Sequence, residues 1–282
     1  MITDMMGVAY SRGACAVPRD DGPARAPQFV RQMRPELNWT IVTPGAFDGD
    51  AIMADRFGEN AAIQKEIYNA TPHASHILIG GDHSVNFGHF AALADRMDDD
   101  LCLIYIEAHL DMHTPESSRA QASGAPHGAN VRALCGDGDK RWHALQKRCP
   151  ALKPENLFYL ASRSWEPAEI DYVREHNIFM RTADTLQTPE QWRAAADEIM
   201  RRIGDRPYVV SFDLDAIDPS YFRDVWVPAP NGITPDAAVF FVQTFAPHAH
   251  GFEFVEYAPT ADSKSAAIFE KLLTIALTEG AC

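Results

Sequence analysis

Short apolar runs alternate along the chain with longer stretches of helical periodicity, and this alternation constrains the fold more than any other feature. The apolar runs have the length of strands and occupy residues 76–79, 101–106, 157–161, 207–212 and 251–255. Helical periodicity covers residues 60–70, 87–97, 189–203, 235–245 and 263–277. Strands that are apolar throughout are typical of a parallel sheet buried on both faces. We therefore expect one α/β domain over residues 1–282, a three-layer α/β/α structure with a mainly parallel sheet.

The charge balance excludes several classes of partner. The chain carries 25 Lys and Arg residues against 39 Asp and Glu residues, a net charge of −14 without any basic block, so a nucleic acid or an anionic membrane would be repelled. The longest apolar runs are far shorter than the ~20 residues of a membrane-spanning helix. Residues 1–12 lack the basic-then-apolar order of a signal peptide, and the five cysteines are scattered without zinc-site spacing. We expect a cytoplasmic protein with a small-molecule partner.

Polar segments follow several of the apolar runs. They are residues 80–84 (Gly-Gly-Asp-His-Ser), 107–111 (Glu-Ala-His-Leu-Asp) and 213–219 (Asp-Leu-Asp-Ala-Ile-Asp-Pro), and Glu256 follows the last run. Ligands of parallel sheets bind beyond the carboxyl ends of the strands. Each segment alone is also compatible with an ordinary turn or a hydrogen-bonding histidine. Three of them at strand ends indicate one common site.

The carboxylates and imidazoles of these segments can converge. In an extended segment, residues i, i+2 and i+4 point to the same side, which groups Glu107, His109 and Asp111. The same geometry pairs Asp213 with Asp215. We therefore expect these side chains to meet at one edge of the sheet.

With His83 added, the set holds two imidazoles and four carboxylates. So many carboxylates in one place are costly unless cations lie among them. A carboxylate-rich donor set with a minority of imidazoles suits Mn²⁺ better than a cysteine-rich zinc site or an all-oxygen calcium site. We expect two Mn²⁺ ions per chain that bind and activate a water between them.

The polar segments also carry a family resemblance. Residues 80–84 and the run Ser-Phe-Asp-Leu-Asp-Ala-Ile-Asp-Pro at residues 211–219 resemble the signatures of the ureohydrolase family of arginase and agmatinase. A weaker likeness covers residues 7–13. The resemblance implies an arginase-like fold and a two-manganese cluster that hydrolyses guanidino groups to urea and an amine. It also implies a homo-oligomer, a trimer or a hexamer.

The resemblance implies a place for each residue of the metal set, one pair for each ion and one bridging pair: His83 with Asp111, His109 with Asp215, and Asp213 with Glu107. The family has Asp where this chain has Glu107, so the bridging carboxylate is one methylene longer. Asp111 also counts among the catalytic residues.

Two further residues acquire catalytic roles from the resemblance. Residues 123–128 (Ser-Gly-Ala-Pro-His-Gly) resemble the arginase segment whose histidine exchanges protons with the departing amine. His127 is therefore the expected general acid and base, which suits the near-neutral reference pKa of imidazole. Glu256 corresponds to the carboxylate that binds the guanidinium, since a planar cation favours a bidentate partner. A loop histidine in solvent and a buried structural glutamate are the alternatives.

The loops that would hold the rest of the substrate resemble arginase but differ in detail. Glu166 falls where an Asp contacts the α-amino group, Ser123 falls where a hydroxyl contacts the α-carboxylate, and His113 replaces an Asn with the same duty. Trp226 and Val227 replace a Gly and a Thr beside the guanidinium, which makes that wall bulkier and removes a hydroxyl. We expect a guanidine derivative or a modified arginine as substrate. Alternatively, Glu166 and His113 are ordinary polar residues of solvent-exposed loops.

These observations favour a binuclear manganese amidinohydrolase that releases urea or a substituted urea and an amine. A hydrolase of formimidoyl or other amidine C–N bonds is the close alternative. The other alternative is a non-catalytic homologue that binds metal poorly and serves as an oligomer partner, because Glu107 and Trp226 both depart from the family.

Overall fold

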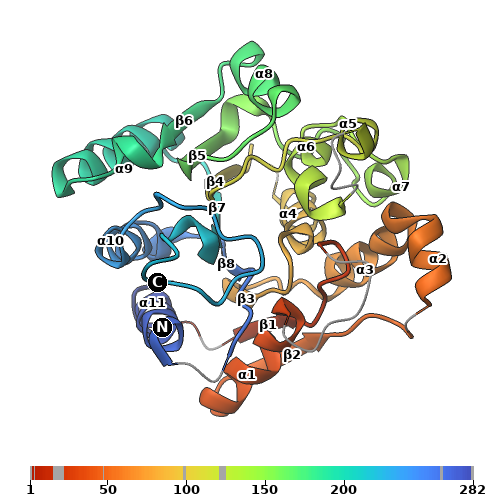
Figure 1. The fold of residues 1–282 in the computed structure, drawn as a ribbon, viewed down its shortest axis with the longest axis horizontal. Helices are drawn as coiled ribbons and strands as arrows, with labels where there is room; N and C mark the ends of the chain where they lie inside the picture. The colour runs from red at the N-terminus through yellow and green to blue at the C-terminus, as the bar shows by residue number, and fades with distance from the viewer. Residues whose placement is uncertain are drawn as a thin grey trace.

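The predicted sheet is present, and within the described residues it contains eight strands that are all parallel (Figure 1). The computed structural model describes residues 2, 4–14, 22–46, 48–97, 100–120, 125–260 and 263–280. The strands are β1 (Asp4–Val8), β2 (Asn38–Val42), β3 (His76–Ile79), β4 (Cys102–Ile106), β5 (Leu157–Ser162), β6 (Phe179–Thr182), β7 (Tyr208–Asp213) and β8 (Gly251–Val255). Their order across the sheet is β2-β1-β3-β8-β7-β4-β5-β6. The predicted α/β class is confirmed.

Helices cover both faces of this sheet (Figure 1). They are α1 (Ala26–Met33), α2 (Gly49–Ala54), α3 (Arg56–Ala70), α4 (Asn86–Ala94), α5 (Pro115–Ala120), α6 (Asn130–Leu134), α7 (Lys140–His143), α8 (Pro167–Glu175), α9 (Pro189–Ile203), α10 (Pro235–Phe245) and α11 (Ser263–Glu279). Side chains of α1, α9, α10 and α11 form one hydrophobic cluster with the strands. Side chains of α3, α4, α6 and α8 pack on the opposite face in separate clusters. The result is the three-layer arrangement that buried parallel strands require.

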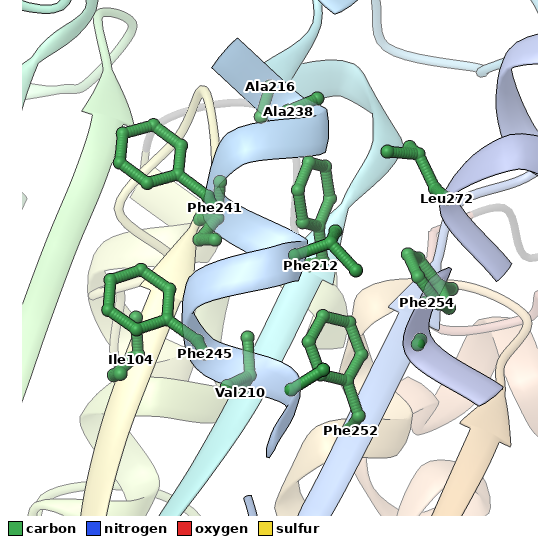
Figure 2. Packing of buried hydrophobic residues seen from close by; sticks show 14 of the residues in the cluster. Ile104, Val210, Phe212, Ala216, Ala238, Phe241, Phe245, Phe252, Phe254 and Leu272 are labelled. Carbon is green, nitrogen blue, oxygen red and sulfur yellow. The ribbon is translucent and has the colours of Figure 1, made fainter. Parts of the chain in front are cut away.

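Aromatic side chains fill the layer between the sheet and α10 (Figure 2). Phe241 and Phe245 of α10 share one hydrophobic cluster with Phe212 of β7 and with Phe252 and Phe254 of β8. At most 1% of any of these five residues is exposed. Burying one such side chain contributes about 1.5–3 kcal/mol. This layer therefore fixes α10 on two central strands.

The helices α9 and α10 begin and end where the sequence predicts, because their local signals are strong. Thr188 caps α9 by accepting a hydrogen bond from the Gln191 N–H at 3.4 Å, and Pro189 occupies the first helical position. Gly204 follows the helix with a φ of 61°, in the left-handed region that glycine tolerates. Thr234 caps α10 in the same manner as Thr188 caps α9.

Some elements were not predicted from the sequence. The strands β2 and β6 lie at the two edges of the sheet and leave part of their side chains exposed, so they do not read as apolar runs. The strand β1 is only five residues long and contains a glycine. The helix predicted over residues 87–97 ends at Ala94. Among the described residues, no helix combines the length and the apolar character needed to cross a lipid bilayer.

Candidate metal centre and substrate pocket

The candidate site residues lie at the carboxyl ends of four strands that are neighbours in the sheet. These strands are β3, β8, β7 and β4, in that spatial order. His83 follows β3, Glu256 follows β8, Asp213 ends β7, and Glu107 follows β4. The backbone N–H of His83 donates to Glu256 Oε1 at 2.9 Å, although 173 positions separate the two residues. The sheet therefore assembles the polar segments at one edge, as the strand pattern predicts.

Two groups of side chains in the described residues could each hold a metal ion, and they share Glu107. One group is His83, Glu107 and Asp111, and the other is Glu107, His109 and Asp215, with the ligand atoms of each group within 4.8 Å of one another. Glu107 Oε2 lies 2.7 Å from His83 Nδ1, and Glu107 Oε1 lies 3.1 Å from His109 Nδ1. The longer side chain at position 107 thus offers one oxygen to each group.

Asp213 lies beside the first group. Its Oδ2 is 3.1 Å from His83 Nδ1, and its Oδ1 accepts the backbone N–H of Asp215 at 2.8 Å. In the second group, Asp215 Oδ2 is 3.0 Å from His109 Nδ1. All six predicted ligands therefore line the same cavity.

The backbone between Glu107 and Asp111 is less regular than the sequence predicts. Asp111 has a φ of 51°, so the segment is not extended throughout. The His109 N–H donates to Glu107 Oε1 at 2.8 Å, which folds the loop back on itself. Asp111 Oδ2 accepts hydrogen bonds from the Tyr105 hydroxyl at 2.7 Å and from the Asn130 amide at 3.2 Å. The three side chains reach one cavity through an irregular loop rather than through strand alternation.

The crowded carboxylates have strongly shifted pKa values. Burial, with the Glu107 charge adding to it, raises the pKa of Asp111 to about 7 and that of Asp215 to about 6. Burial and the Asp215 charge raise the pKa of Asp213 well above its usual value. Burial alone would also raise the pKa of Glu107, but hydrogen bonds from the neighbouring histidines hold it well below its usual value. Carboxylates in this state gain from nearby cations, and the imidazole–carboxylate donor set fits divalent ions such as Mn²⁺.

The cavity that holds the ligand groups is also lined by other side chains. Its volume is about 240 Å³. Besides the predicted ligands, it is lined by His113, His127, Gly128, Ser164, Trp165, Glu166, Glu169, Val227 and Glu256.

Two residues named from the sequence are not among those lining this cavity. Trp226 lies elsewhere, and its ring is packed against Gly22. Ser123 lies outside the described residues. Conversely, the sequence analysis did not single out Ser164, Trp165 or Glu169. Their only sequence signal is that they share one short segment with Glu166.

Glu256 and His127 both present atoms without a hydrogen-bond partner beside the ligand groups. Glu256 Oε2 and His127 Nδ1 are buried and make no hydrogen bond within the described part of the chain. Glu256 has a φ of 60°, and its N–H donates to Gly81 O at 2.8 Å, so its backbone is firmly placed. Burial, with the charges of His109 and Arg56, lowers the pKa of His127 to about 3. The imidazole of His127 is therefore neutral at pH 7, and this burial makes it a weaker base than the near-neutral reference pKa used in the sequence analysis.

His113, Glu166 and Glu169 form the far end of the cavity. His113 Nε2 lies 3.3 Å from Glu166 Oε2 and 3.7 Å from Glu169 Oε2, while its Nδ1 lies 3.0 Å from Ser117 Oγ. His113 is buried, with only 6% of the residue exposed, so it is not a polar residue of a solvent-exposed loop. The side chain of Glu166 is 39% exposed. This end of the cavity therefore combines a buried imidazole with two carboxylates.

Arg163 connects the loops around the cavity. Its guanidinium donates to the carbonyl oxygens of Asp215 at 2.6 Å, Ala216 at 3.2 Å and Ala229 at 2.7 Å. It also donates to Pro230 O at 3.1 Å. One half-buried side chain thus holds the loop of the second ligand group against the loop that carries Val227. The sequence analysis did not identify this role.

The comparison with protein families gives one match that spans almost the whole chain. Residues 5–277 match the model described as the Arginase family. Curated proteins that resemble the chain include an arginase from Entamoeba histolytica, 27% identical over 193 residues, which are 67% of this chain and 63% of that protein. A non-hepatic arginase from Xenopus laevis is 30% identical over 173 residues, 59% of this chain and 47% of that protein. The chain thus spans about half to two thirds of the length of these curated relatives.

Solved structures show the same fold. The arginase from Bacillus subtilis has a TM-score of 0.81 and 20% identity, with 98% of both chains covered. A formimidoylglutamase from Bacillus subtilis has a TM-score of 0.74 and 20% identity, with 99% of this chain and 87% of that chain covered. At these identities the likeness establishes the fold.

Proposed function

Because this chain belongs to the arginase family, we propose that it is a binuclear-metal hydrolase of linear amidines. Its substrate is a small guanidino compound, arginine-like or modified, and its products are urea or a substituted urea and an amine. The observation that carries the proposal is the pair of ligand groups that share Glu107, next to the free carboxylate oxygen of Glu256. Two Mn²⁺ ions per chain are the expected cofactor.

Six side chains that line the cavity are the candidate ligands for two ions. His83 and Asp111 would hold one ion, and His109 and Asp215 would hold the other. Glu107 would bind both, with Asp213 beside it. When bound, such a metal pair lowers the pKa of a water between the ions and orients it for attack.

Glu256 is suited to hold the guanidinium. Its Oε1 is occupied by the His83 N–H, whereas its Oε2 is buried without a partner. An unpaired buried acceptor is costly, and a guanidinium N–H would satisfy it with a charge-assisted hydrogen bond. This contact would place the central carbon of the guanidinium over the ligand groups.

His127 is suited to move the proton that the reaction needs. Hydrolysis adds water to the guanidino carbon, breaks one C–N bond and requires a proton on the departing nitrogen. His127 Nδ1 lacks a partner and lies 3.9 Å from Glu256 Oε1, close to where a bound guanidinium would lie. A neutral imidazole there can accept the proton released by the attacking water and donate it to the amine.

The far end of the cavity favours a substrate other than plain arginine. Glu166 can accept from an amino group, with His113 and the hydroxyl of Ser123 as candidates for the rest of an amino-acid head. Val227 offers no hydrogen bond where arginase-like loops carry a hydroxyl, and a donor or acceptor left unpaired costs about 1–3 kcal/mol. We expect a substituted or less polar guanidine to be turned over faster than arginine.

A substrate panel tests this proposal. The protein is loaded with Mn²⁺, its metal content is measured, and release of urea or ammonia is followed with arginine, N-hydroxyarginine, agmatine, guanidinobutyrate and formimidoylglutamate. We expect close to two ions per chain and activity on a guanidino compound. Fast turnover of arginine would contradict the proposed specificity, and activity on formimidoylglutamate alone would favour the amidine alternative. A fully loaded protein that is inactive on the whole panel would favour the non-catalytic homologue.

The assembly and location of the protein complete the proposal. We expect a trimer or a hexamer in the cytoplasm. Sedimentation velocity of the full chain checks the first expectation, and a monomer at micromolar concentration would contradict it. Cell fractionation checks the second.

A further inference from the structure

A chain of buried polar side chains runs away from the metal centre between the sheet and α4. It begins at His83 Nε2, which lies 2.8 Å from Ser211 Oγ. Ser211 lies directly opposite Glu253 in the register of β7 and β8, and its hydroxyl lowers the pKa of that carboxyl. Glu253 Oε1 contacts His89 Nδ1, and His89 Nε2 lies 2.7 Å from His76 Nε2. At most 2% of any of these five residues is exposed. Burying ionisable groups in a sheet interior is unfavourable unless they are paired, so this polar chain requires an explanation.

Donors and acceptors can be assigned at the end near the metal centre. His83 Nδ1 faces the carboxylates of the first ligand group, as it would to bind a metal. Its Nε2 is then the nitrogen that carries the proton, and it donates to Ser211 Oγ. The Ser211 hydroxyl can in turn donate a hydrogen bond to the carboxylate of Glu253, which only accepts when ionised.

The two histidines at the other end of this polar series, His89 and His76, favour the ionised form of Glu253. Burial, with the charge of His89, lowers the pKa of His76 to about 3, so the His76 ring is neutral. His76 Nδ1 donates to Ala74 O at 2.8 Å, and its Nε2 accepts from His89. His89 Nδ1 lies against Glu253 Oε1 and can donate to it. Burial alone would raise the pKa of Glu253, but the His89 charge and the hydrogen bonds that Glu253 accepts lower it.

We propose that Glu253 is a positioning residue of the metal centre, which acts through Ser211 to fix the orientation and the tautomer of the metal ligand His83. The proposal rests on the proposed function, because it requires that His83 bind a metal. Metal-ligating histidines whose other N–H is hydrogen-bonded are better oriented and more basic, and loss of such a partner typically costs 10–100-fold in metal affinity. Glu253 itself is not among the residues that line the cavity.

A purely structural role is the competing explanation. Glu253 of β8 also accepts from Asn86 at 2.8 Å, and both Asn86 and His89 belong to α4. These contacts could simply join the helix to the sheet. Such a joint would not depend on Ser211, whereas the proposed role does. The two explanations therefore differ in whether the effects of Glu253 and Ser211 are coupled.

A double-mutant cycle of metal affinity tests the proposal. Full-length Ser211→Ala, Glu253→Gln and the double variant are freed of metal with a chelator and titrated with Mn²⁺ against a fluorescent chelator. We expect each single variant to weaken the binding of one ion by about 10–100-fold. The double variant should bind no more weakly than Ser211→Ala, because Glu253 acts only through that hydroxyl. The ion of the second ligand group should change by less than about twofold.

A spectroscopic measurement supports the cycle even if one variant is unstable. In the Zn²⁺-loaded protein, ¹⁵N NMR of the histidine rings should show a hydrogen-bonded Nε2–H on His83, and this signal should shift in Glu253→Gln. The matched control is Glu59→Gln, which also removes one negative charge. Its carboxylate accepts a hydrogen bond from the Tyr10 hydroxyl and does not belong to the series of buried polar residues from His83 to His76. Its metal affinity and its His83 signal should equal those of the parent.

Additive losses in the double variant would overturn the proposal in favour of the structural role. An unchanged affinity and an unchanged His83 signal in Glu253→Gln would overturn it as well. In both cases a parent that binds two ions would leave the proposed function intact. A parent that binds no metal would overturn the proposed function and this inference together.

Discussion

The two faces of the sheet differ in character where β7 and β8 run side by side. Toward α10 these strands present Phe212, Phe252 and Phe254 (Figure 2). Toward α4 they present Ser211, which directly precedes Phe212, and Glu253, which lies between Phe252 and Phe254. Alternate residues of a strand point to opposite faces. Each of these two strands therefore contributes to the hydrophobic core with one set of residues and to the polar cluster with the other. The apolar face contributes free energy of folding, while the polar face adjoins the candidate metal centre.

Truncation on the apolar face should have the largest effect. Phe241→Ala removes a fully buried ring and leaves a cavity, so we expect the free energy of unfolding to fall by about 3–5 kcal/mol. Urea unfolding of the metal-free protein measures this, with the exposed Lys271→Ala expected to stay within about 0.5 kcal/mol of the parent. Metal affinity of the folded variant should stay within about twofold. A tenfold loss would show that the two faces are not separable.

Removal of the shared ligand should have the next largest effect, on metal binding. Glu107→Ala should weaken Mn²⁺ binding by at least about 100-fold, equivalent to about 2.7 kcal/mol, because both groups lose an oxygen. Glu107→Asp should keep or raise the affinity, since it restores the shorter bridge of the family. Isothermal titration measures both. If Glu107→Ala binds metal as tightly as the parent, Glu107 is not a ligand.

Arg163→Lys should lower the free energy of unfolding by about 2 kcal/mol. A lysine has three donors and cannot reproduce the planar set, so buried carbonyls lose partners at about 1–3 kcal/mol. We also expect weaker metal binding, because the Asp215 loop loses its tie to the loop of Val227. Thermal unfolding and metal titration check this, with the exposed Arg174→Lys as control. If Arg163→Lys is as stable to thermal unfolding as Arg174→Lys, Arg163 does not hold the two loops together.

A residue of the polar face should also make the free energy of unfolding depend on pH, by up to about 1.4 kcal/mol per pH unit. The folded pKa of His76, about 3, is below the usual 6.5, so its contribution to stability is complete above pH 6.5 and is lost as the pH falls toward 3. Urea unfolding of the parent and of His76→Gln at several pH values isolates this residue, since Asp111 and Asp215 titrate in both proteins. The parent should lose more stability than the variant below pH 6.5. Parallel curves would contradict the prediction.

The sequence predicts the centre of this fold better than its periphery. The strands β3 and β8 agree with the prediction to the residue because they are buried on both faces and therefore apolar throughout. The edge strands β2 and β6 are partly exposed and carry no such signal. The predicted ligands meet in one cavity because the ends of neighbouring strands meet. Their roles in metal and substrate binding stay predictions.

The contacts that support the site were not predictable in the same way. Glu253 lies inside an apolar run, and its partner His89 is 164 positions away, so no local spacing marks the pair. Arg163 binds backbone carbonyls, and such acceptors occur at every residue and leave no trace in the sequence. The left-handed conformation of Asp111 also has no local signal. Long-range partners and backbone acceptors are properties of the folded chain.

The position of β8 has a consequence for the order in which the protein can fold during synthesis. This strand comes last in sequence among the strands of the described residues, yet it pairs with β3 on one side and β7 on the other. A nascent chain that lacks β8 holds two separate parts of the sheet, with the backbone groups of β3 and β7 unpaired at facing edges, and such edges favour misassembly. The sheet and the site residues at its carboxyl edge can therefore be completed only after residues 251–256 have left the ribosome.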